Sequence, residues 1–226
     1  MSKVDAAFLA RMERILWLYA QPYYERYPVV CFDERPCFLI GDEAEPLSMH
    51  TDKVLREHYT YEKNGSCALL AATEPLTGRR LATVYERRTE KEYALFLKAL
   101  AEAYPKAVKI RLVQDNLSTH NASSFYEHLP AAEAFSLAQR FEFYYTPKSA
   151  TWLNMIEIEF SALVKQCLNR RIPTQEKLIK EVRAIVKERN SKRIKTNWQF
   201  SIQAARKKLN SAYQVVNPLN DQYEAT

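Results

Sequence analysis

Three acidic residues of this sequence stand where carboxylates commonly bind a metal ion. Asp33 ends the apolar run VVCFD, Asp115 ends the alternating run KIRLVQD, and Glu157 lies near the start of a helical pattern. Carboxylate oxygens suit Mg²⁺ or Mn²⁺, and the shortage of His or Cys near these acids argues against zinc. Two such ions about 3.5–4 Å apart could activate an attacking oxygen and stabilise a leaving one in phosphoryl transfer. The three acids therefore indicate a centre of nuclease type, although an acid at a strand end is more often a turn former or a helix cap.

Predicted strands and helices explain how these acids could meet. Apolar and alternating runs predict five strands, at residues 29–33, 66–72, 80–86, 109–115 and 141–147. Helical spacing and capping patterns predict helices at 6–20, 89–104, from the NLSTH segment to about 129, 152–169, 174–190 and 200–213. The first three strands should form an antiparallel meander. The order β-β-β-α-β-α-β-α then predicts an α/β domain around a mixed sheet. If the first and fourth strands are neighbours, their ends present two carboxylates side by side, and a helix crossing that edge can add the third.

Composition is that of a compact protein. The chain has 226 residues, 47% of them hydrophobic, which is enough for one domain or one domain with an extension. The N-terminal segment lacks the features of a signal peptide and its charges interrupt any membrane-spanning run, so we expect a soluble cytoplasmic protein without a membrane partner. Four scattered cysteines without a C-x-x-C pair indicate neither a disulfide framework nor a zinc site.

Positive charge gathers near the C-terminus. Residues 165–208 hold 14 Lys or Arg against three acids, a net charge of +11, so the rest of the chain carries −5. Such polarity suits a protein that binds phosphates with one part and cations with another, although a solvated helical face is the alternative. Six cations are the best candidates for contacts with DNA: Lys148, Arg170, Arg171, Lys192, Arg193 and Lys195.

Other polar and aromatic residues have more than one reading. Asn116 and His120 could orient Asp115 or touch a phosphate, or simply form a turn and a helix cap. Glu34 should face away from Asp33 and form a structural ion pair. Trp152 could stack on a base or pack in the core. Trp198 is expected to be a packing anchor, and no ligand spacing is evident for His50, His58 or His128.

Three longer strings carry a resemblance to a known family. They are CFDE (31–34), LVQDNLSTH (112–120) and YTPKSATWLNMIEIE (145–159). These strings resemble the signature blocks of bacterial insertion-sequence transposases of the mariner-like superfamily, in particular the insertion sequence six-thirty group. The connecting segments YEKNGSC, EPLTGRR and RRTEKEYA and the C-terminal segments QCLNRRIP and NWQFSIQAARKKL are also similar, so the resemblance covers about residues 16–213.

The resemblance implies a ribonuclease H-like fold with an Asp-Asp-Glu triad that binds two divalent ions, Mg²⁺ or Mn²⁺. On this sequence the triad falls on Asp33, Asp115 and Glu157. It also implies an endonuclease that nicks DNA at transposon ends and then directs the freed 3′-hydroxyl into target DNA, typically at a TA dinucleotide. The implied partners are the double-stranded DNA of the transposon ends and of the target, and a second copy of the chain in a homodimer on DNA. The expected setting is the nucleoid of a bacterial cytoplasm.

Two departures from the family pattern matter. The 41 residues between Asp115 and Glu157 form a longer gap than is common in the wider superfamily, which keeps Glu159 open as the third ligand. Glu157 is preferred because it directly follows the LNMI string, whereas Glu159 would point to another helix face. No counterpart of the family's N-terminal helix-turn-helix region is seen, so the chain could be half of a split reading frame, with that region encoded separately, or a truncated remnant.

The expected organisation has three parts, with a helix and linker at 1–24, the catalytic domain at 25–170 and a basic helical extension at 171–226. The leading hypothesis is a DNA transposase. A ribonuclease H-like nuclease or resolvase that acts on other nucleic-acid structures is the second. A catalytically silent DNA-binding or regulatory remnant is the third.

Overall fold

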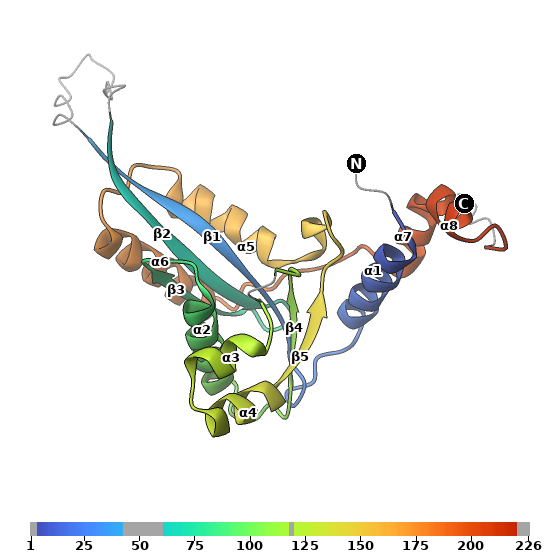
Figure 1. Ribbon diagram of the computed structural model, residues 1–226. Helices are drawn as coiled ribbons and strands as arrows, with labels where there is room; N and C mark the ends of the chain where they lie inside the picture. The colour runs from blue at the N-terminus through green and yellow to red at the C-terminus, as the bar shows by residue number, and fades with distance from the viewer. Residues whose placement is uncertain (1–3, 43–60, 118–119, 221–226) are drawn as a thin grey trace, which may run out of the picture.

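The chain folds around one five-stranded mixed sheet. The computed structural model describes residues 4–42, 61–117 and 120–220, and Figure 1 shows the arrangement of its elements. The strands lie in the order β3-β2-β1-β4-β5. Their bounds are β1 Val29–Asp42, β2 Tyr61–Glu74, β3 Arg79–Tyr85, β4 Ile110–Gln114 and β5 Phe141–Tyr145. Strands β1, β2 and β3 pair antiparallel, whereas β4 pairs parallel with β1 and β5. The predicted meander and the predicted α/β class are therefore confirmed.

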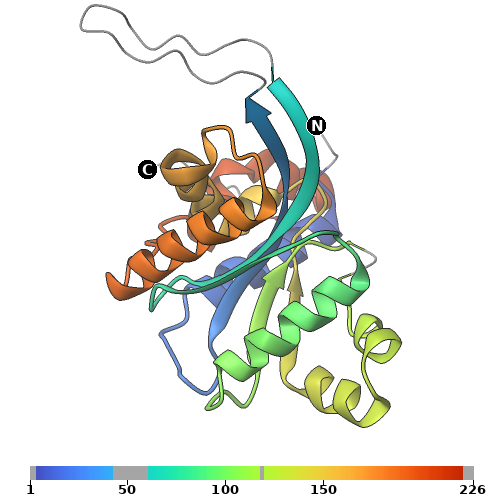
Figure 2. The same cartoon turned by 90° about the vertical axis from the view of Figure 1, so that its left-hand side faces the viewer.

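Strand β1 is longer than the sequence pattern indicated. We predicted that it ends at Asp33, but it continues to Asp42. Beyond Cys31, β1 pairs with β2 alone, because its pairing with β4 stops at that residue. A strand with one unpaired side tolerates Pro36, which lacks a backbone N–H. As a result β1 and β2 form a long hairpin that extends past the other strands (Figures 1 and 2).

Helices cover both faces of the sheet. On one face lie α2 Glu90–Ala103, α3 Ser123–His128 and α4 Ala131–Gln139, and on the other lie α5 Ile156–Leu163 and α6 Gln175–Ser191 (Figure 2). Alternation along β1 divides the two cores, since Phe32 packs against α2 whereas Cys31 packs on the side of α5. The predicted cap of α2 is present, because Glu92 accepts a hydrogen bond of 3.0 Å from the Thr89 backbone N–H.

Three helical predictions need correction. The single helix predicted at 200–213 is divided into two, α7 Ile202–Lys208 and α8 Asn210–Val216. The single helix predicted at 152–169 is broken into a 3₁₀ turn, η1 Thr151–Leu153, the helix α5, and a π-helical turn, η2 Val164–Leu168. The break falls at Asn154, whose backbone is extended and whose side chain bonds to β1. Helix α4 was not predicted, although Pro130 precedes it and Ala134 and Leu137 are buried at helical spacing.

The two ends of the chain pack together beside the sheet. Helix α1 Ala6–Tyr19 shares an apolar core with α7 Ile202–Lys208 and α8 Asn210–Val216, and Figure 1 shows these helices as a group at one side. An ion pair joins them, because Arg206 donates two hydrogen bonds, of 2.7 and 2.9 Å, to Glu13. The N-terminal helix and the end of the basic region therefore form one unit. No helix in the described part of the chain is long and apolar enough to cross a membrane.

Candidate active site

The parallel pairing of β1 with β4 brings Asp33 and Asp115 level with each other. Cys31 and Val113 form the last pair of this ladder, and Asp33 and Asp115 each lie two residues beyond it. Asp115 directly follows the end of β4, and neighbouring strands lie about 4.8 Å apart. Asp33 shares the strand face of Cys31, which is the face that α5 covers. The two acids thus lie side by side at the carboxyl edge of β4.

Glu157 approaches the same edge from the first turn of α5. Its charge and that of Asp115 both act on Asp33, and the pKa of Asp33 is about 7 against an ordinary 3.8. Burial is the largest cause of this rise, and the two neighbouring carboxylates add to it. A hydrogen bond of 2.8 Å from the Glu34 backbone N–H to Asp33 Oδ1 opposes the rise. The structure therefore brings the three predicted acids into one electrostatic environment.

The donor set of these acids fits a hard divalent cation. All three offer carboxylate oxygens, and a cation between them would relieve the repulsion that helps to raise the pKa of Asp33. Their oxygens do not all lie within 4.8 Å of one another; in the described part of the chain, Glu90, Glu127 and His128 form a group that does. That group lies at the surface, at the start of α2 and the end of α3. The spacing of these three residues in the sequence does not predict that they lie together. His50 and His58 lie outside the described residues.

Comparison with known proteins identifies the family. Residues 28–179 match the family described as DDE superfamily endonuclease. The chain belongs to this family. A search of the curated proteins found no match.

Solved structures agree with the fold of this DDE superfamily endonuclease. The Mos1 mariner paired end complex with Mn is 12% identical and has a TM-score of 0.57, over 96% of this chain and 63% of that one. The Mos1 strand transfer complex is also 12% identical, with a TM-score of 0.58 over 93% of this chain and 63% of that one. The predicted ribonuclease H-like fold is confirmed. The chain spans about 63% of the length of these solved chains.

His120 holds Asp115 from the α2 side of the sheet. Its Nδ1 lies 2.5 Å from Asp115 Oδ1, and its Nε2 lies 3.5 Å from Glu34 Oε1. The ring is buried and stacks on Tyr93, with 4.8 Å between the ring centroids. Burial lowers the pKa of His120, but the bonds to the two carboxylates outweigh it and raise that pKa to about 9. Of the roles that the sequence left open for His120 in the DDE endonuclease, the geometry favours orienting Asp115.

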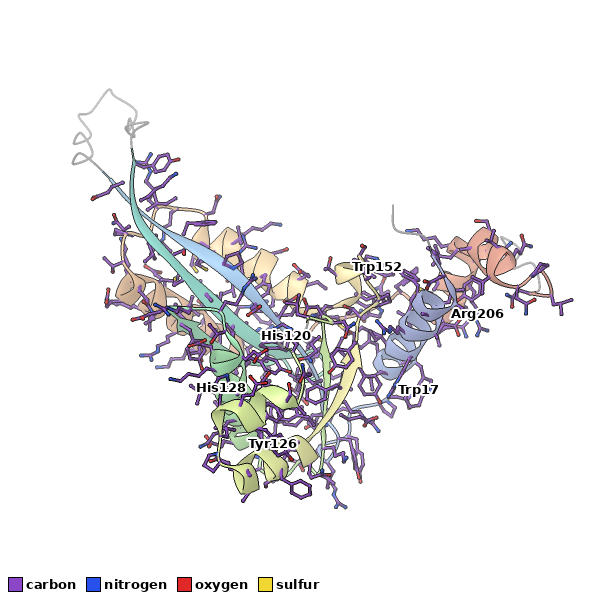
Figure 3. The ribbon with its side chains drawn as sticks, viewed as in Figure 1. Trp17, His120, Tyr126, His128, Trp152 and Arg206 are labelled. Carbon is purple, nitrogen blue, oxygen red and sulfur yellow. The ribbon has the colours of Figure 1, made fainter. Side chains whose placement is uncertain are left out.

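Neighbouring residues of this site are also placed. Glu34 pairs with the Arg88 Nε at 3.4 Å, so its predicted ion pair is confirmed. Asn116 is exposed. Trp152 is 47% exposed and meets the Phe200 ring edge-on, which leaves both of its readings open (Figure 3).

Glu159 occupies a different environment from Glu157. Its side chain is buried, and Arg189 donates to both of its oxygens at 2.8 and 3.0 Å. Arg80 adds a second guanidinium, with its Nε 2.8 Å from Glu159 Oε2. Two buried cations therefore neutralise Glu159, so the geometry favours Glu157 as the third ligand. Neither arginine was singled out from the sequence, because the partners lie 79 and 30 residues away from Glu159.

The predicted DNA-contact residues lie on three separate segments. Lys148 is exposed in the loop between β5 and η1, next to Ser149, whose φ is 63°. Arg170 and Arg171 precede α6, beside the strand β1, since the Ile40 backbone N–H bonds to the Ile172 carbonyl at 2.9 Å. The third segment carries Lys192, Arg193 and Lys195. It follows α6 and packs against the turn between β2 and β3. The six cations therefore come from three segments of the chain.

Some of this basic charge is already paired. Arg170 lies 2.5 Å from Glu181, and Lys192 pairs with Glu188. Arg193 and Lys195 are exposed and have no ion-pair partner within residues 4–42, 61–117 and 120–220. Trp198, in contrast, donates a hydrogen bond of 2.8 Å to the Phe200 carbonyl and packs between two cores, so its predicted packing role is confirmed.

Proposed function

We propose that this chain is the catalytic domain of a DNA transposase of the mariner-like superfamily, which cleaves DNA and joins strands at Asp33, Asp115 and Glu157. One observation supports the proposal: Asp115 and Glu157 lie close enough to Asp33 for their charges to help raise its pKa. Membership of the DDE superfamily endonuclease family supports a nuclease. The resemblance of the three signature strings to insertion sequence six-thirty transposases supports the bacterial group, and with it a reaction at the nucleoid.

Two divalent ions, Mg²⁺ or Mn²⁺, are the proposed cofactors, held by Asp33, Asp115 and Glu157. When bound, such ions would activate the attacking oxygen and stabilise the leaving oxygen at phosphorus. The protein's part is to fix the ligands: β1 and β4 set the spacing of the two aspartates, and α5 carries Glu157 to them. His120 bonds to one oxygen of Asp115, which restricts the rotation of that carboxylate.

The proposed partners are the double-stranded DNA of the transposon ends and of the target, with two copies of the chain holding two ends. Solved Mos1 structures are paired end and strand transfer complexes, which supports this choice. We propose that three exposed cations contact DNA phosphates, namely Lys148, Arg193 and Lys195. Three more can contribute where a phosphate replaces their present partner, namely Arg170, Arg171 and Lys192. A separately encoded helix-turn-helix half would add recognition of the ends.

A nicking assay tests the proposal. Purified protein is incubated with supercoiled plasmid and Mg²⁺ or Mn²⁺, beside the variants Asp115→Asn and Glu102→Gln. Asp115→Asn removes a ligand charge with little change in volume, so nicking should fall to background, whereas the exposed Glu102 on α2 should be dispensable. Equal nicking by Asp115→Asn would remove this residue from the mechanism. Retained DNA binding without nicking by the parent would instead support a catalytically silent DNA-binding remnant.

A further inference from the structure

Asn154 lies buried between β1 and α5, the two elements that carry Asp33 and Glu157. Its side chain is 2% exposed. The amide Nδ2 donates a hydrogen bond of 2.8 Å to the carbonyl of Phe32, the residue directly before Asp33. The amide Oδ1 accepts from the Ile156 N–H at 3.4 Å, and the Asn154 backbone carbonyl accepts from the Glu157 N–H at 3.2 Å. One residue therefore contacts the backbone beside two of the three acids.

The hydrogen bond from Asn154 to Phe32 lies where the pairing of β1 with β4 has ended. The ladder between β1 and β4 ends at Cys31, and Asn154 bonds to the next residue of β1. Asn154 also interrupts the helical run, since its backbone is extended between η1 and α5. The start of α5 is thus set by a side chain fixed to β1 rather than by continuation of the preceding turn. A buried amide that loses its partners leaves unsatisfied polar groups, so the arrangement has few alternatives.

We propose that Asn154 is a positioning residue that holds Glu157 at a fixed height relative to Asp33 and thereby sets the affinity of the site for divalent ions. This inference rests on the metal site of the proposed function. Without the amide, α5 would keep its apolar packing through Ile156 and Phe160, but its first turn would lose its bond to β1. Glu157 would then sample more positions, and the ion would lose one well-placed ligand.

Asn190 offers a matched control. It is a partly buried Asn with two side-chain bonds to the backbone, because its Oδ1 accepts from the Arg80 N–H at 2.8 Å and its Nδ2 donates to the Arg80 carbonyl at 3.0 Å. Arg80 lies on β3, which carries none of the three acids. Replacing Asn190 removes comparable bonds from the fold and leaves the proposed ligands alone.

The test compares the parent chain with Asn154→Ala, Asn154→Ser and Asn190→Ala. Circular dichroism establishes folding, and calorimetry with Mn²⁺ alone measures affinity. Fe²⁺ with ascorbate and peroxide then cleaves the backbone near bound metal and reports which ligands hold it. Asn154→Ala should weaken Mn²⁺ binding by roughly 10-fold or more. It should also suppress the cut near Glu157 while the cuts near Asp33 and Asp115 persist, and Asn190→Ala should match the parent in both measurements.

Several results would overturn this inference. Parental Mn²⁺ affinity and an unchanged cutting pattern in folded Asn154→Ala would do so while leaving the metal site standing. Equal losses in Asn190→Ala would show that general loosening, not positioning, sets the affinity. If Asn154→Ala does not fold, Asn154→Ser, which keeps a short hydrogen-bonding group, decides by the same two measurements. A parent chain that binds no Mn²⁺ would overturn the proposed function as well.

Discussion

Replacing Asp33 by Asn should stabilise the folded protein and abolish the proposed metal-dependent activity. The pKa of Asp33 is raised from 3.8 to about 7, chiefly by burial and further by the charges of Asp115 and Glu157. In the unfolded chain this carboxyl ionises near its ordinary pKa, so at neutral pH the folded state alone bears the cost of a buried charge. Asn has nearly the same shape without that charge, and its Oδ1 can still accept the bond from the Glu34 N–H.

The size of the effect follows from the pKa. A rise from 3.8 to about 7 corresponds to at most ~4 kcal/mol of lost stability above pH 7. Solvent screening reduces this figure, because the Asp33 side chain is only partly buried. We expect Asp33→Asn to gain ~1–2 kcal/mol, or roughly 3–6 °C in melting temperature for a chain of this size. The sign is fixed by the raised pKa: the gain is complete above pH 7, shrinks as the pH falls, and vanishes below about pH 4.

Thermal melts without divalent ions at pH 8, 6 and 4 measure this prediction, with Glu102→Gln as an exposed control that should match the parent throughout. Mn²⁺ at pH 8 provides a second arm, since it should stabilise the parent by binding the folded state and leave Asp33→Asn unaffected. A variant less stable than the parent at pH 8 would refute the reasoning. So would a gain of equal size at pH 8 and pH 4, because the stabilisation would then not come from removing a charge.

Three further predictions concern the ion pairs and cations. Glu159→Gln should lower the free energy of unfolding by ~3 kcal/mol in denaturant titrations, because it leaves buried guanidiniums unpaired. Glu157→Gln should change that free energy by less than about 0.5 kcal/mol. Similar losses in both variants would contradict the distinction drawn between the two residues. Replacing Arg193 and Lys195 together by Ala should reduce the magnitude of the logarithmic salt slope of DNA binding by roughly 2, and an unchanged slope would exclude them from phosphate contact. Glu13→Gln should lower the free energy of unfolding by ~0.5–1 kcal/mol at pH 7. The hydrogen bond from Arg206 is the main cause that lowers the pKa of Glu13, so the difference between variant and parent should disappear as the pH falls below 4.5. A difference that persists at that pH would contradict the pairing.

The sheet and the adjacency of the two aspartates were predictable because each predicted strand has a strong local signal. The runs before Asp33 and Asp115 are short, apolar and rich in β-formers. The continuation of β1 to Asp42 was not predictable in the same way. Its sequence holds Pro36 and an irregular mixture of polar and apolar residues, and the strand persists because β2 pairs with it over its whole length beyond Cys31.

The break at Asn154 shows how a tertiary contact overrides a local pattern. Apolar residues continue through WLNMIEIEF at spacings that a single helix would satisfy, so the sequence predicted one. The hydrogen bond to the Phe32 carbonyl comes from a residue 122 positions away and ends the turn before α5. Burial within the basic region was also not evident from the sequence. Arg189 contributes to the net charge counted for residues 165–208, but in the structure it is buried against Glu159.

Glu157 and Glu159 lie two residues apart on one helix, but their electrostatic environments differ. The fold places two guanidiniums beside Glu159, so this buried acid is neutralised within the protein. At the neighbouring edge Asp33, Asp115 and Glu157 lie near one another. Of these three acids His120 bonds to Asp115, and its other ring nitrogen pairs with Glu34. In the described part of the chain no arginine or lysine pairs with any of the three acids. In a protein selected for stability alone, the ionised carboxylate of Asp33 would be a disadvantage, because burial and repulsion both raise its pKa and destabilise the ionised form. A divalent cation bound from solvent would offset this cost. Asp33, Asp115 and Glu157, rather than the arginine-paired Glu159, are therefore the residues to test as ligands.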